Sequence, residues 1–292
     1  MYELVSVTER SFYIQSPSRS GLFKLSDSEV CLIDGGSHSD AAKKILRILA
    51  DNQWTLKCVF NTHSHADHIG GNKLLRDRTG CRIYAPGIEC AFTRHPVLEP
   101  AFLYGAFPPH DLRHKFLMAE PSPAEYLTPE VLPDGMEIIP LPGHCFDMAG
   151  FRTPDGVVYL ADALSSREIL DKYKIGFIYD VGAYLDTLER VKSMPARMFV
   201  PAHAEPTAEI APLAEYNIAR TLEVADRICE LCREPATVDE LLKKLFDAYG
   251  LTLNFDQYVL VGSTLRSYLA WLKGKSRVQP EFSDNLLRWR SC

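Results

Sequence analysis

The feature that most constrains the fold of this chain is a cluster of metal-ligand side chains between a strand-like run and a helical run. Residues 62–71 read THSHADHIGG, which places His63, His65, Asp67 and His68 within six residues. On a continuous helix these side chains would not share one face, whereas on a tight loop they can converge. Neutral imidazole and carboxylate are suitable ligands for Zn²⁺ and other borderline divalent metals. The chain is therefore expected to hold this loop at the end of a strand.

Three later candidate ligands also come directly after strand-like runs. His144 follows the run MEIIPLPG, Asp162 follows VVYLA and His203 follows MFVPA. Parallel strands that end together would bring these loops to one edge of the structure, where ligands bind in α/β proteins. Together with the first cluster they offer seven nitrogen and oxygen ligands, about the number that two metal ions need with room left for water. The sequence thus predicts a binuclear metal site.

The sequence around these residues predicts an α/β architecture. Strand-like runs occupy residues 11–15, 21–25, 29–34, 56–62, 81–86, 136–143, 150–154, 157–162 and 198–203. Helical patterns occupy residues 41–52, 68–80, 166–173 and 181–194. Because strands and helices mix in two successive halves, we expect helices on the outside of packed sheets.

Two segments depart from this pattern. Residues 87–135 are rich in proline and aromatic residues and too long for an ordinary connection, so we interpret them as a partly helical excursion and a candidate active-site lid. From residue 211 the chain becomes helical, and residues 275–292 are expected to form a hairpin. Three helices and a small ribbon resemble a winged-helix module. The sequence therefore predicts a catalytic domain over residues 1–210 and a winged-helix-like domain over residues 211–292.

Charge and composition narrow the classes of function. The net charge of -6 argues against a general binder of nucleic-acid phosphates. From Leu265 onward, six basic residues face two acidic ones, which gives this segment a local charge of +4. No apolar run approaches the roughly 20 residues of a membrane span, and no apolar segment follows a basic start, so neither membrane insertion nor a signal peptide is expected. Eight scattered cysteines are typical of reduced thiols in a cytoplasmic protein.

The motifs together resemble the metallo-β-lactamase superfamily over roughly residues 10–210. The matching residues are Asp34 in LIDGG, the HSHADH cluster, His144, Asp162 and His203. The resemblance implies a four-layer αββα sandwich. It also implies that metal 1 is held by His63, His65 and His144, that metal 2 is held by Asp67, His68 and His203, that Asp162 bridges them, and that Asp34 orients the ligands. The best-known lactamase subclass has cysteine at the bridging position, so Asp162 is more similar to the glyoxalase II and nuclease branches.

Three functions remain open on the sequence alone. The first is hydrolysis of a thioester or ester of a small molecule by a metal-bridging hydroxide, with Asp67 as the catalytic residue that orients the nucleophile or moves a proton. The second is a phosphodiesterase or endoribonuclease whose C-terminal domain contacts RNA, which the local positive charge favours. The third is a non-catalytic metal-binding module, which the complete ligand set disfavours. Zn²⁺ is the expected metal, Fe and Mn accept the same ligands, and a homodimer is a further expectation.

Overall fold

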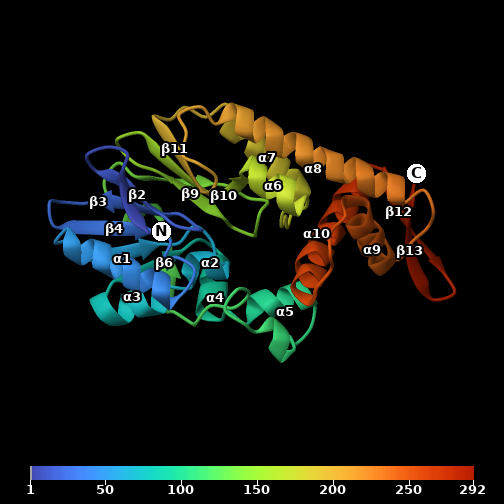
Figure 1. Ribbon diagram of the computed structural model, residues 1–292, viewed down its shortest axis with the longest axis horizontal. Helices are drawn as coiled ribbons and strands as arrows, with labels where there is room; N and C mark the ends of the chain where they lie inside the picture. The colour runs from blue at the N-terminus through green and yellow to red at the C-terminus, as the bar shows by residue number, and fades with distance from the viewer. Residues whose placement is uncertain (1) are drawn as a thin grey trace.

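Two facing β-sheets form the centre of the computed structural model, which describes residues 2–292, and helices cover both outer faces (Figure 1). The first sheet contains, in spatial order, Glu3–Ser6 (β1), Ser11–Gln15 (β2), Ser20–Lys24 (β3), Glu29–Ile33 (β4), Thr55–Phe60 (β5), Arg82–Ala85 (β6) and Ala124–Tyr126 (β7). The second contains Met198–His203 (β11), Val157–Ser165 (β10), Ala149–Arg152 (β9) and Glu137–Pro140 (β8). The predicted αββα sandwich is confirmed.

The first sheet is part antiparallel and part parallel. Strands β1 to β4 form an antiparallel meander, whereas β4 to β7 run parallel to one another. In strand β4 the four residues after Glu29 are apolar, because they are buried on both faces of the sheet. Val30 and Leu32 pack toward the outer helices, while Cys31 and Ile33 belong to the core between the two sheets. In the second sheet β10 pairs parallel with β11 and antiparallel with β9.

Helices Ser39–Asp51 (α1) and Asn72–Thr79 (α3) pack against the first sheet, and Val181–Lys192 (α7) packs against the second. The short helix Ala66–Ile69 (α2) lies between β5 and α3, and Arg167–Tyr173 (α6) follows β10. The prediction of one helix over residues 68–80 was wrong, because Gly70 and Gly71 separate α2 from α3. A Cβ atom on Gly70 would lie 2.1 Å from the carbonyl oxygen of Ser37, and one on Gly71 would lie 2.1 Å from that of Gly35. Only glycine allows the ligand loop to approach this backbone.

The segment 87–135 is partly helical, as predicted. It contains Glu89–Arg94 (α4), Leu98–Tyr104 (α5) and two short 3₁₀ helices, His110–Leu112 (η1) and Pro129–Val131 (η2). It also contributes β7, an edge strand of the first sheet that the sequence analysis did not predict. Helix α5 extends away from the sandwich toward the C-terminal helices (Figure 1). Movement of this segment as a lid remains a prediction.

The C-terminal region consists of Ala211–Leu231 (α8), Val238–Tyr249 (α9), Phe255–Gly274 (α10) and the predicted hairpin, Val278–Ser283 (β12) with Leu286–Ser291 (β13). Helix α8 packs against α7 and β10, so Leu188 of α7, Val224 of α8 and Leu269 of α10 share one apolar core. The domain boundary at residue 210 remains a prediction. Among residues 2–292, no helix has the length and apolar character of a membrane span.

Candidate metal centre

The structure brings all seven predicted ligand side chains to one place, in two groups. The ligand atoms within each group lie within 4.8 Å of one another. The first group is His63, His65 and His144, and the second is Asp67, His68, Asp162 and His203. They come from four segments: the loop between β5 and α3, the loop after β8, strand β10 and the last residue of β11. The candidate metal centre therefore lies where segments from both sheets meet.

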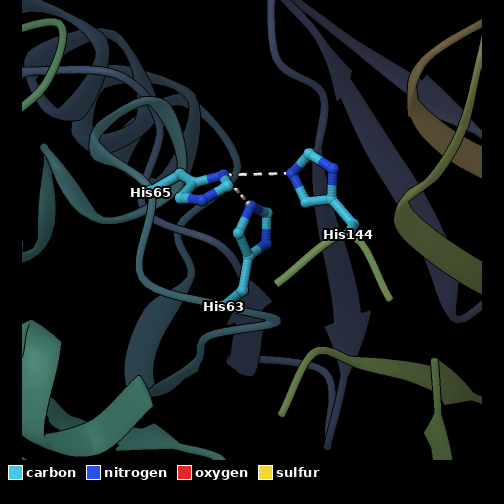
Figure 2. Close-up of side chains that lie close together, drawn as sticks. All are labelled: His63, His65 and His144. Carbon is cyan, nitrogen blue, oxygen red and sulfur yellow. Dashed lines mark hydrogen bonds between the residues drawn. The ribbon is translucent and has the colours of Figure 1, made fainter. Parts of the chain in front are cut away.

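In the first group three imidazole nitrogens face one another (Figure 2). The Nδ1 atom of His65 lies 3.0 Å from the Nε2 atoms of both His63 and His144. The Nδ1 atom of His144 lies 3.1 Å from the carbonyl oxygen of Phe177, an acceptor that requires the proton on Nδ1 and leaves a lone pair on Nε2. Burial lowers the pKa of His65 and of His144 to about 4, so both rings are neutral near pH 7. Neutral rings whose nitrogens converge in this way are suited to holding a metal ion.

In the second group two carboxylates meet two imidazoles. The Nε2 atom of His203 lies 3.1 Å from Oδ2 of Asp67 and 3.3 Å from Oδ2 of Asp162. The Nε2 atom of His68 lies 3.1 Å from Oδ1 of Asp162. Burial alone would raise the pKa of Asp162, but His203 and His68 outweigh burial and hold this pKa well below its usual range. The carboxylate is therefore ionised.

Asp162 lies between the two groups. Its Oδ2 atom is 3.5 Å from Nε2 of His144 in the first group and 3.3 Å from Nε2 of His203 in the second. Its Oδ1 atom is buried and makes no hydrogen bond within the described part of the chain, although Nε2 of His68 is close. A buried carboxylate oxygen without a hydrogen bond is costly unless another partner satisfies it. The residues present therefore fit a pair of divalent metal ions with Asp162 between them.

The backbone of β10 is distorted where Asp162 enters the site. Ala161 has a φ of +49°, and the pairing of β10 with β11 is irregular on both sides of this residue. Such bulges re-aim side chains next to functional sites, and a non-glycine residue in this conformation is strained. The expectation that Asp162 follows the end of a strand was wrong, since the strand continues to Ser165.

Asp34 contacts both a ligand and the loop that carries it. The residue directly follows β4 and has a φ of +65°, a conformation that aspartate adopts more readily than most residues. Its Oδ1 accepts the backbone N–H of Thr62 at 2.8 Å, and its Oδ2 accepts the hydroxyl of Thr62 at 2.8 Å. Oδ2 also lies 2.8 Å from Nδ1 of His68, which places a proton on Nδ1 and turns Nε2 toward the second ligand group.

Two glutamates near the centre were missed by the sequence analysis. Glu89 of α4 accepts the backbone N–H groups of Ser64 at 3.0 Å and of Asp147 at 3.1 Å, so it joins the two histidine-bearing loops. Oε1 of Glu99 in α5 lies 3.5 Å from Nε2 of His65, and burial raises the pKa of Glu99 to about 8. Both glutamates lie in the segment 87–135, and neither is spaced from the histidines in a pattern typical of metal ligands. The sequence feature that could have indicated them is an acidic residue within an otherwise apolar helical run.

Three cavities border the ligand residues. One of about 180 Å³ is lined by His65 and Asp67, one of about 470 Å³ by His203, and one of about 50 Å³ by His144 and Asp162. A further cavity of about 680 Å³ between α5 and α10 has none of the seven ligands in its lining. The cavities beside His65 and His203 are the relevant ones for substrate, because they border ligand side chains and are larger than the cavity beside His144.

Comparison with known proteins identifies the family. Residues 14–203 match the family model described as the metallo-beta-lactamase superfamily. A hydroxyacylglutathione hydrolase from Methylococcus capsulatus is 27% identical over 211 residues, which cover 70% of this chain and 71% of that protein. The protein of the same name from Rhodopseudomonas palustris is 51% identical over 45 residues, so the chain spans only 18% of that relative's length.

Solved structures share the arrangement of the whole chain, including the C-terminal helices. A beta-lactamase domain protein from Burkholderia ambifaria has a TM-score of 0.73 and 18% identity over 99% of this chain and 94% of its own. A metallo-beta-lactamase family protein from Thermus thermophilus has a TM-score of 0.72 and 20% identity over 100% of this chain and 98% of its own. With the family match over residues 14–203, the chain belongs to the metallo-beta-lactamase superfamily.

Proposed function

We propose that the chain hydrolyses a thioester or ester of a small molecule with two divalent metal ions. In this proposal metal 1 is held by His63, His65 and His144, metal 2 is held by Asp67, His68 and His203, and Asp162 bridges them. Zn²⁺ is the proposed metal, and elemental analysis distinguishes it from Fe and Mn, which accept the same nitrogen and oxygen ligands.

The observation that carries this proposal is the match to a hydroxyacylglutathione hydrolase over 70% of the chain. The name of that relative describes hydrolysis of an acylglutathione, which is a thioester. A carboxylate at the position of Asp162, between the two groups, is compatible with this chemistry, since it accepts two cations at once. The wide cavity beside His203 has room for a larger leaving group.

The roles of the side chains follow from their contacts. Bound divalent metals supply hydroxide at neutral pH and polarise the scissile carbonyl. Asp67 lines the cavity next to His65 and is more exposed than Asp162, so it reaches the reacting groups and can pass a proton to the leaving thiolate or alkoxide. Asp34 and the carbonyl oxygen of Phe177 hold His68 and His144 in the tautomers that ligation requires.

A nuclease function is the second candidate, and the C-terminal charge is the observation that favours it. The ion pairs of this C-terminal segment weaken the case for RNA binding, however. Arg277 pairs with Asp226 at 2.9 Å, and Arg290 lies 3.7 Å from Glu281, so two of its six cations have acidic partners. An RNA contact through the remaining cations would make binding fall steeply with salt, because bound counterions are released.

One experiment compares these functions on the same sample. The metal-free protein is reconstituted with Zn²⁺, Fe²⁺ or Mn²⁺, its metal content is measured, and turnover is followed with a thioester, an ester, a phosphodiester and a short single-stranded RNA. We expect thioester or ester hydrolysis that chelation abolishes and that Asp162→Asn reduces together with metal content. RNA cleavage with a steep salt dependence would contradict the proposal and support the nuclease. Full metal occupancy without turnover of any substrate would support a non-catalytic metal-binding module.

A further inference from the structure

The cavity beside His65 is lined by apolar side chains from three separate segments. Phe116 and Leu117 come from the excursion, Phe177 comes from the loop after α6, and Leu260 comes from α10. Leu117 is buried, whereas Phe116 is 72% exposed and so stands at the rim. These walls meet only because α5 and the following loop pack against α10.

One wall of this cavity touches the first ligand group directly. The ring of Phe177 packs edge-on against the rings of His65 and His144, with centroids 5.3 Å and 5.7 Å apart. The position of the apolar wall relative to the reacting centre is therefore fixed by the same residue whose carbonyl oxygen faces His144. An apolar group in this cavity would extend from a carbonyl held at the metal centre.

The surrounding contacts indicate that the cavity is preformed. Nε2 of His114 in the excursion lies 3.0 Å from Oδ1 of Asp256 at the start of α10. Beneath this contact, Leu112, Leu117 and Val259 form a small buried cluster. The excursion is thus attached to α10 by one polar contact and one apolar core.

The cavities beside His203 and His65 differ in their charged groups and share no lining residue. The cavity beside His203 measures about 470 Å³, and five charged side chains line it: Arg19, Arg167, Glu168, Glu205 and Glu209. The cavity beside His65 measures about 180 Å³, and its one acidic group besides the ligand Asp67 is Glu99, whose pKa burial raises to about 8. A cavity of about 150 Å³ with apolar walls binds benzene, so this one holds a phenyl ring or a chain of about five to six carbons.

From this pairing, and resting on the proposed hydrolysis, we infer that the cavity of Phe116, Leu117, Phe177 and Leu260 is an acyl subsite that selects substrates with a medium-length apolar acyl group. The larger cavity beside His203, which charged side chains line, then receives the leaving thiol or alcohol. Each methylene buried in the subsite raises kcat/KM by about fourfold until the cavity is full. Leu260 of α10 is one wall of this subsite, so in this inference the C-terminal region helps to set the preferred acyl length.

The test uses the metal-loaded full chain and thioesters of one small thiol with acetyl, butanoyl, hexanoyl, decanoyl and phenylacetyl groups. The wild-type protein is expected to show rising kcat/KM from acetyl to hexanoyl, good turnover of phenylacetyl, and a fall at decanoyl. Leu260→Trp fills the subsite and shifts the preference toward acetyl, changing the hexanoyl-to-acetyl ratio at least tenfold. Leu260→Ala widens it and shifts the preference toward decanoyl. The matched control is Leu222→Ala, an exposed leucine on α8 outside the cavity, which leaves the profile unchanged.

A binding measurement separates this inference from the proposed function. Calorimetry of the loaded protein is expected to detect hexanamide binding at least tenfold tighter than acetamide binding, a preference that Leu260→Trp removes. If no thioester is hydrolysed but hexanamide binds in this way, the proposed reaction fails while the apolar subsite stands. If thioesters are hydrolysed with no dependence on acyl length, or if both Leu260 variants keep the wild-type profile, the acyl subsite is overturned.

Discussion

The Nδ1 atom of His68 lies 2.8 Å from Oδ2 of Asp34, and both side chains are buried in the interior. This contact joins the end of strand β4 to the ligand loop after β5, which are neighbours in the parallel part of the first sheet. Because Nδ1 of His68 donates its proton to Asp34, Nε2 is the nitrogen that remains to bind a metal once its own proton is displaced. The sheet thereby determines which atom of His68 faces the second ligand group.

Asp34→Asn is expected to weaken metal binding without removing a ligand. The amide nitrogen that replaces one carboxylate oxygen faces His68 or Thr62 as a donor, so the tautomer that frees Nε2 of His68 is no longer favoured. Loss of such a partner typically costs about 10–100-fold in metal affinity. Competition with a chromophoric chelator measures the effect. Asp27→Asn, at a fully exposed aspartate, is the matched control, and equal affinities in the two variants would contradict the orienting role of Asp34.

Glu89→Gln is expected to destabilise the fold around the centre. The carboxylate accepts the N–H groups of Ser64 and Asp147 and the hydroxyl of Ser64, and its residue is almost completely buried. Replacing one oxygen by a donor leaves one of these two N–H groups unpaired, so the free energy of unfolding of the metal-free protein should fall by about 2 kcal/mol. Urea unfolding measures this change. Glu130→Gln, at an exposed position, serves as the control, and equal midpoints would exclude the linking role of Glu89.

Metal binding is expected to release protons near pH 7.5. Burial alone would lower the pKa of His203, but Asp162 and Asp67 outweigh burial and raise it to about 10 in the metal-free protein. His203 is therefore protonated at pH 7.5, whereas a ligating imidazole must be neutral, so affinity should rise with pH up to about this value. Calorimetry of Zn²⁺ binding in buffers of different ionisation enthalpy counts the protons. His203→Asn should reduce the count by about one, and an unchanged count would contradict ligation by this residue.

The convergence of the seven candidate ligands could be expected from the sequence because most of them lie near strand ends. His63, His144 and His203 each follow an apolar run, and such runs are recognised as strands from their pattern alone. Asp162 was predicted to follow its strand but lies within it, because the distortion at Ala161 depends on pairing with β11 and leaves no local sequence signal. A bulge arises from a partner strand about forty residues away, so periodicity cannot reveal it.

The partly helical character of the segment 87–135 could be predicted from the sequence, but its contacts could not. Its proline and aromatic content indicated a long, partly helical segment. The contacts of Glu89 with Ser64, of Glu99 with His65 and of His114 with Asp256 join residues far apart in the chain. Tertiary packing alone creates these contacts, and the same is true of the apolar subsite, whose walls come from three segments.

In the proposed function two metal ions held by the seven side chains drive hydrolysis, and titration of the metal-free protein with Zn²⁺ is the most direct test. Metal content and thioester turnover are followed together in the wild-type protein and in His65→Ala. We predict that the turnover rate of the wild-type protein reaches its maximum at two equivalents of Zn²⁺. His65→Ala should bind one equivalent less, and its kcat/KM should fall by at least about a hundredfold. Turnover without bound metal, or a His65→Ala variant with wild-type metal content and activity, would contradict the account.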